Sequence, residues 1–205
     1  MTDFGPFASF EDALNEACPL ILSKPNASVS HIKDPELALR VSTEYCAWLY
    51  YTPDDKYRMS MLTDQSDVGD LLTKRRTCRL PAFVDDRRYP PHSLKYIFAL
   101  HNHPFGGPLS LADMHQIIAF ANTHEWVVET KDGKIPIAIV AFFSRSDDHS
   151  KPTCDGFYQY TPETRYLLQF NRAQEGWRRD EIGQVTWINT TTYQLNGKTY
   201  RFGSK

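Results

Sequence analysis

The stretch that decides the fold is YIFALHNHPFGGPLSLADMHQI, Tyr96 to Ile117. A continuous apolar run leads into His101 and His103, and such a run is typical of a central strand that is covered on both faces. A turn rich in proline and glycine follows. Ser110 then stands three residues before Asp113, which is a helix-start signature. The stretch therefore predicts strand, turn and helix in direct succession.

The two histidines of this stretch form a candidate metal site with the aspartate. Alternate residues of a strand point to the same side, so His101 and His103 aim at one point while Asn102 faces away. If Ser110 caps the helix, Asp113 lies in its first turn, close to the end of the strand. Two histidines and one aspartate suit a catalytic zinc ion that keeps its fourth position for water.

Simpler readings of the same residues exist. Ser110 and Asp113 alone are only a capping box, and a chance H-x-H is not rare. The combination of H-x-H-P, glycine and S-x-x-D on one strand, turn and helix nevertheless favours the metal site over these readings.

The N-terminal part of the chain predicts two helices. Ser9, three residues before Asp12, marks the start of the first, and Pro19 is expected to end or bend it. Asp34 is expected to cap the second, with Pro35 at its first position.

The middle of the chain predicts a β-sheet. Residues 44–52 and 57–63 suit a hairpin around the turn PDDK, and residues 66–80 suit a polar loop with room for a short helix. Two more strands are expected in 126–130 and 135–143, joined around Lys131-Asp132-Gly133. The order of elements predicts an α/β (α+β) sandwich, with a mixed central β-sheet flanked by helices, over residues 1–143.

Residues 144–205 are more polar and are expected to be a C-terminal extension packed on the core. Within them, YTPETRYLLQFNRAQ (160–174) predicts a helix capped by Thr161. The stretch 185–202 predicts a β-hairpin with Asn196-Gly197 as a type I′ turn.

Composition narrows the functional classes. The 205 residues have a net charge of −2, without the basic surplus typical of nucleic-acid-binding domains. No apolar run approaches the roughly 20 residues of a membrane span, and the acidic N-terminus lacks a signal-peptide pattern. A soluble, cytoplasmic protein is therefore expected, with secretion left open and nucleic acid and membrane partners disfavoured. Oligomeric state is left open.

The four cysteines show no C-x-x-C spacing, so a cysteine-based zinc site is disfavoured. Cys18 and Cys46 stand in apolar surroundings and are expected to be buried thiols. Cys78 and Cys154 stand in polar stretches, where a disulfide between them is one option that spacing alone does not establish.

The segment HNHPFGGPLSLAD, residues 101–113, resembles the signature of the JAMM (MPN+) zinc metalloproteases, H-x-H-P-x-G followed by S-x-x-D. This family includes deubiquitinating enzymes, prokaryotic peptidases that act on ubiquitin-like proteins, and bacterial RadC-like proteins. The tetrapeptide HNHP, residues 101–104, especially resembles the RadC-like branch. The resemblance implies a cytidine-deaminase-like sandwich and Zn²⁺ held by His101, His103 and Asp113. Nine residues separate His103 from Asp113 where the family usually has ten, so Asp113 must reach the metal from a slightly different helix start.

The resemblance also implies two catalytic residues. The family needs an upstream glutamate at a helix-to-strand junction, and Glu44 fits best because a strand follows it directly. Glu36 is the runner-up, but its carboxylate suits the first turn of a helix. In the mechanism that the resemblance implies, zinc would lower the pKa of its water, and Glu44 would take the proton and deliver it to the leaving amine. Ser110 would donate a hydrogen bond to the oxyanion.

The other histidines are weaker candidates. His115 follows Asp113 by two residues, which turns it away on a helix, so a surface or supporting position is expected. Four further histidines lack partners at ligand spacing: His31, His92, His124 and His149. A serine hydrolase is unsupported, because no serine sits in a G-x-S-x-G turn.

The function expected from the resemblance is a zinc metallopeptidase or isopeptidase. Its substrate is expected to be an extended C-terminal tail of a ubiquitin-like or other protein, laid beside a strand edge. The alternatives are a non-catalytic JAMM-fold binding module, a RadC-like DNA-associated protein, and a JAMM-like domain of a bacterial toxin system.

Overall fold

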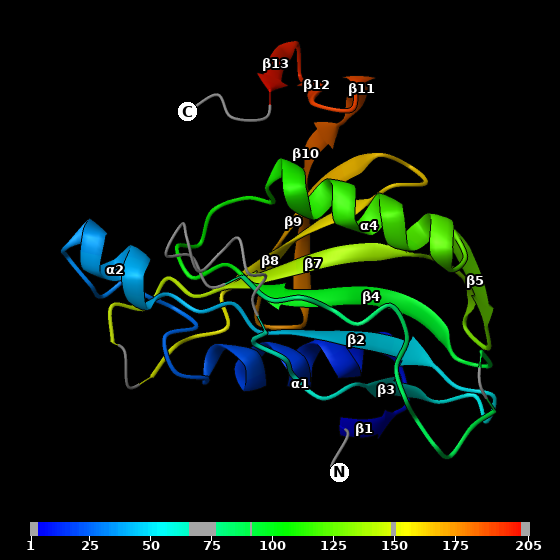
Figure 1. Cartoon of the computed structure of the whole chain (residues 1–205). Coiled ribbons are helices and arrows are strands. Elements are labelled where there is room, and N and C mark those ends of the chain that lie inside the picture. The colour runs from blue at the N-terminus through cyan, green and yellow to red at the C-terminus, as the bar shows by residue number, and fades with distance from the viewer. Residues whose placement is uncertain (1–3, 66–76, 91, 149–150, 202–205) are drawn as a thin grey trace.

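The computed structural model describes residues 4–65, 77–90, 92–148 and 151–201. Its main feature is an eight-stranded sheet in the order β1-β3-β2-β4-β7-β8-β9-β10 (Figure 1). The strands are β1 (Phe4–Phe7), β2 (Cys46–Tyr51), β3 (Tyr57–Met59), β4 (Lys95–Asn102), β7 (Ala138–Phe143), β8 (Gly156–Thr161), β9 (Tyr166–Arg172) and β10 (Trp177–Gln184). Strands β4 and β7 are parallel, whereas the other neighbouring pairs in this order are antiparallel. The prediction of a mixed sheet with helices is confirmed.

Both faces of the sheet are covered, which explains the apolar run of β4. The alternation is clearest in β2. Its odd-numbered residues pack in the core that contains α1 (Phe10–Leu22), and its even-numbered residues pack in the core that contains α4 (Leu111–Thr123). Every residue of β2 is buried. The sheet is therefore the middle layer, with α1 on one face and α4 on the other.

The two N-terminal helices form where they are predicted. Ser9 caps α1, its Oγ accepting from the N–H of Asp12 at 3.1 Å, and Asp34 caps α2 (Pro35–Val41). Of the two options for Pro19, ending or bending the first helix, the ending is excluded, since α1 continues past Pro19 to Leu22. Ile21 and Leu22 are fully buried against the sheet, and this burial favours the extra turn.

The expected strand over 135–143 is divided. Strands β5 (Val127–Thr130) and β6 (Gly133–Pro136) pair in a separate two-stranded sheet, joined at the predicted turn. The chain then enters the main sheet as β7, beside β4. The predicted hairpin of β2 and β3 is confirmed. Of the predicted loop 66–80, residues 66–76 lie outside the described part of the chain.

The C-terminal region continues the main sheet, because β8 pairs with β7 across the expected boundary at residue 143. The helix predicted over 160–174 is wrong: these residues end β8, turn, and return as β9. Arg165 has a φ of 61° in this turn, which interrupts any helix there. Pairing with β8 and β10 on either side outweighs the local helix signal.

A small three-stranded sheet follows, made of β11 (Thr186–Asn189), β12 (Thr192–Leu195) and β13 (Lys198–Arg201). The predicted hairpin is confirmed in β12 and β13. Asn196 and Gly197 both have positive φ, 51° and 76°, as a type I′ turn requires. Trp187 of β11 packs against His115 of α4, so this sheet contacts the helix layer.

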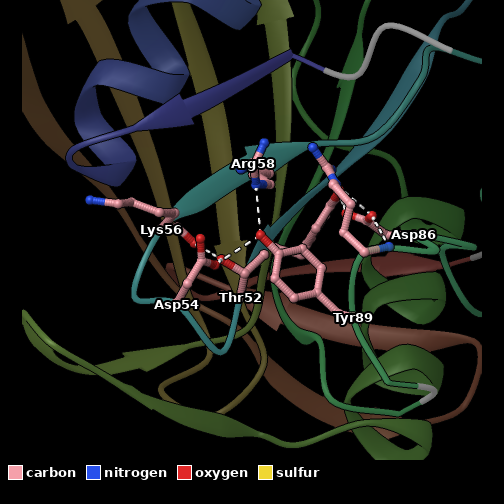
Figure 2. A network of polar contacts seen from close by, with 8 residues as sticks. Thr52, Asp54, Lys56, Arg58, Asp86 and Tyr89 are labelled. Carbon is pink, nitrogen blue, oxygen red and sulfur yellow. Dashed lines mark hydrogen bonds and ion pairs between the residues drawn. The ribbon is translucent and has the colours of Figure 1, made fainter.

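A polar network fastens the loop before β4 to the hairpin of β2 and β3 (Figure 2). The hydroxyl of Tyr89 donates to Asp54 at 2.8 Å and accepts from Nε of Arg58 at 3.2 Å. Thr52 also donates to Asp54, and Tyr50 donates to Asp86 in the same loop. These contacts lie at the start of β4, at the far end of that strand from His101.

Two disulfides link distant segments, Cys18–Cys154 and Cys46–Cys78. The pairing of Cys78 with Cys154 that the sequence left open is therefore wrong. Cys18 and Cys46 are buried as expected, but they are bonded rather than free thiols. The two bridges join residues 136 and 32 positions apart, a distance over which sequence spacing carries no pairing information.

No helix in the described ranges combines the length and the apolar character needed to cross a bilayer.

Candidate metal site

The metal candidates converge where the strand β4 gives way to α4. Nε2 of His101 and Nε2 of His103 lie 3.0 Å apart. The nearer carboxylate oxygens of Asp113 lie 3.6 Å from Nε2 of His101 and 3.3 Å from Nε2 of His103. Two atoms bound tetrahedrally at 2.0–2.1 Å from one ion stand about 3.3 Å apart. The three side chains therefore have the spacing of a shared metal ion.

Backbone carbonyls orient both imidazoles. Nδ1 of His103 lies 2.8 Å from the carbonyl oxygen of Gly107, to which it must donate. The ring of His101 is hydrogen-bonded in the same way to the backbone of Val140, on the neighbouring strand β7. A histidine that donates through one ring nitrogen presents the lone pair of the other, which is the usual support of a metal-binding imidazole.

The carboxylate of Asp113 has a second task at the start of α4. Its Oδ2 accepts from the backbone N–H of Ser110 at 2.6 Å, while Oγ of Ser110 accepts from the N–H of Asp113 at 3.2 Å. This is the complete capping box that the sequence predicts. The turn between His103 and Ser110 is one residue shorter than in the JAMM signature, yet Asp113 reaches both imidazoles.

Burial makes these interactions strong. The side chains of His101, His103 and Asp113 are only 6%, 13% and 16% exposed. Burial lowers the pKa of His101 to about 4, against the opposing charge of Asp113. Burial also acts to lower the pKa of His103, but the hydrogen bond and charge of Asp113 outweigh it, and the pKa of His103 is raised.

Asp113 itself stays ionised. Burial acts to raise its pKa, but the hydrogen bond with His103 and the charges of the two imidazoles outweigh burial. The pKa of Asp113 is therefore well below its usual range. The group therefore offers one anionic and two imidazole ligands, provided that His103 is neutral when the metal ion binds.

Glu44 lies beside this group. In the antiparallel pairing of β2 with β4, Cys46 stands opposite His101, and the same register continued by two residues sets Glu44 opposite His103. The charge of Glu44 contributes to the raised pKa of His103. Glu36, the runner-up, lies in the first turn of α2 as expected for a residue that complements the helix dipole.

The remaining histidines in the described ranges do not join the group. His115 packs on Trp187, as expected of a residue turned away from Asp113. His124 stacks on Tyr96 with ring centroids 4.0 Å apart. His101, His103 and Asp113 are the set of metal-ligating side chains found close together in the part of the chain that the structure describes. His149 lies outside that part.

One residue of the site was missed in the sequence. Asn102 was expected only to face away from the metal, but its fully buried amide binds the backbone on both sides of Glu44. Its position between the two histidines was the available signal, since the side of a strand opposite to a pair of ligands must itself be packed or hydrogen-bonded.

Comparisons with known proteins give no further support for a family. No protein-family model, no curated protein and no solved structure matches this chain. The resemblance to the JAMM signature therefore stays a prediction, carried by residues 101–113 and Glu44. What the fold itself establishes is a mixed α/β chain with a buried group of two histidines and one aspartate that can bind a metal ion.

Proposed function

We propose that this chain is a zinc-dependent metallopeptidase or isopeptidase of the JAMM type, with a cytidine-deaminase-like sandwich fold. The observation that carries the proposal is the mutual spacing of His101, His103 and Asp113, whose donor atoms lie 3.0–3.6 Å apart. Two imidazoles and one carboxylate are a set that catalytic zinc uses, leaving one coordination position open.

In the proposed reaction, Glu44 and Ser110 have separate roles beside the metal ion. A zinc ion held by His101, His103 and Asp113 would supply an acidified water and polarise the scissile carbonyl. Glu44, two residues before β2 and close enough to His103 to raise its pKa, would accept the proton of that water and pass it to the leaving amine. The hydroxyl of Ser110 accepts from the N–H of Asp113, so its own proton is available to donate to the oxyanion.

The substrate we propose is an extended peptide, such as the C-terminal tail of a ubiquitin-like or other protein. The alternative of a non-catalytic binding module is less favoured, because a scaffold has no use for two buried histidines whose Nε2 atoms converge on a buried carboxylate. A DNA-associated role draws no support from the net charge of −2.

The two disulfides bear on the compartment. Stable disulfides are rare in the reducing cytosol and common in secreted and periplasmic proteins. We therefore propose an oxidising compartment rather than the cytoplasm expected from the sequence. Labelling of free thiols in protein isolated from its native source tests this: unreactive cysteines support it, and four reactive ones overturn it.

Metal content and cleavage test the proposed function together. We expect purified protein to hold about one zinc per chain and to lose it in His101→Ala. Glu44→Gln should retain the metal and lose cleavage in an unbiased peptide library. Protein that binds zinc but cleaves no member of the library, with folded ubiquitin-like conjugates included, would favour the binding module instead.

A further inference from the structure

Asn102 is the last residue of β4 and is fully buried on the face opposite to the metal ligands. Its Oδ1 accepts from the backbone N–H of Tyr45 at 2.7 Å. Its Nδ2 donates to two carbonyl oxygens, that of Thr43 at 3.0 Å and that of Ala27 at 2.6 Å. Both N–H groups of the amide are therefore in use, which makes the side chain fully committed to backbone contacts.

Two of these bonds enclose Glu44. The carbonyl of Thr43 belongs to the peptide unit that precedes Glu44, and the N–H of Tyr45 belongs to the unit that follows it. Each peptide unit is planar, so fixing the two planes on either side of a residue fixes the direction of its Cα–Cβ bond. One rigid amide thus sets the direction in which the Glu44 side chain leaves the backbone.

The sheet itself does not supply this restraint. Strand β2 begins at Cys46, so Glu44 lies two residues before the ladder of hydrogen bonds with β4. The side-chain amide of Asn102 takes the place of a paired strand, because it accepts from Tyr45 and donates to Thr43. Its third hydrogen bond, to the carbonyl of Ala27, links residues 43–45 to that part of the chain. The N–H of Thr43 donates to the carbonyl of Asn26 at 3.1 Å, which holds the same segment from the other side.

We propose that Asn102 is a positioning residue, which holds Glu44 at the distance from the metal that proton transfer requires. This inference rests on the proposed function. The end of β4 then places the two proposed ligands, His101 and His103, on one side and the restraint on the base on the other, so that ligands and base share one rigid frame. A misplacement of about 1 Å in such a frame typically lowers a rate roughly 10²-fold.

The kinetic test uses Asn102→Ala in the full chain. We expect kcat to fall roughly 10²-fold, with KM and zinc affinity within about twofold of the parent. The matched control is Tyr57→Phe, which removes a buried hydroxyl bonded to Asp132 and Thr130 at the other end of β2 and should leave kcat unchanged. In a Glu44→Gln background, Asn102→Ala should cause no further loss, because the residue that it positions is already inactive. A loss of equal size in both backgrounds would overturn the proposal.

Amide hydrogen exchange tests the restraint without any need for activity. In the metal-free parent protein we expect the N–H of Tyr45 to exchange as slowly as amides in the middle of β2, although it lies outside the strand. Exchange at the rate of an open loop would show that Asn102 does not hold this segment, whether or not Asn102→Ala folds. If exchange is slow but the parent cleaves nothing, the restraint stands and it is the proposed function that fails.

Discussion

Cys46 lies directly opposite His101 in the antiparallel pairing of β2 with β4, and the same cysteine is bonded to Cys78. The residue opposite the candidate ligand His101 is thus covalently tied to the segment that precedes β4. This disulfide holds the edge of the chain next to the site, while Cys18–Cys154 joins α1 to the segment that leads into β8.

We expect the double variant Cys46→Ala/Cys78→Ala to have a free energy of unfolding about 3–4 kcal/mol lower than that of the parent, because the disulfide restricts the unfolded chain. Urea unfolding of the zinc-loaded protein measures this loss. The control Cys18→Ala/Cys154→Ala removes a bridge with a larger sequence separation, 136 against 32, and should cost about 1 kcal/mol more. Equal unfolding midpoints for parent and variants would show that the cysteines are not bonded in solution.

Ser110→Ala separates the helix cap from the catalytic role. The variant should lose about 1 kcal/mol of stability, as any N-cap serine does, and roughly 10²–10³ in cleavage rate. Ser9→Ala is its matched control, since Ser9 caps α1 through the same kind of bond to Asp12. We expect Ser9→Ala to lose similar stability with no change in rate. A Ser110→Ala variant that keeps the parent's rate would remove Ser110 from the mechanism.

Zinc affinity should depend on pH through His103. Zinc binds the neutral imidazole, so below the pKa of His103 the ion must displace a proton. The pKa of His103 is raised by Asp113, whereas that of Asp113 is lowered, so Asp113 stays ionised as the pH falls. We expect affinity to drop about tenfold for each pH unit below the pKa of His103 and to level off above it. Chelator competition between pH 8 and pH 6 measures this, and a flat profile would argue against His103 as a ligand.

The fragment 1–143 tests the expected domain boundary. Cutting there removes β8, leaving the apolar, fully buried strand β7 (AIVAFF) as an open edge. It also removes Cys154, the partner of Cys18. We expect the fragment to aggregate during size-exclusion chromatography, because an apolar edge strand pairs with other chains. A folded, monomeric fragment would instead support a boundary at residue 143.

Much of the site could be predicted from sequence because its signals are local. The period-two spacing of His101 and His103 and the capping box of Ser110 and Asp113 depend on neighbours within three residues. Strand β4 was equally clear, since a strand covered on both faces leaves an uninterrupted apolar run.

Other features depend on distant partners. YTPETR carries a valid helix-start pattern, yet the buried Leu167 and Leu168 belong to β9, which pairs with β8 on one side and β10 on the other. Most of these two partner strands lies outside a short window. Disulfide pairing likewise depends on which segments the fold brings together. The hydrogen bonds of Asn102 reach Ala27, 75 residues earlier, and no local pattern announces such a contact.

Asp113 is both the cap of α4 and a candidate metal ligand, so the order of this helix would report a bound ion. An ion bound between the imidazoles would use the same carboxylate that holds the first turn of α4. Ion binding and the order of this turn would therefore affect each other. Because Trp187 packs on His115, two residues after Asp113 in α4, its fluorescence offers an intrinsic readout of chelation.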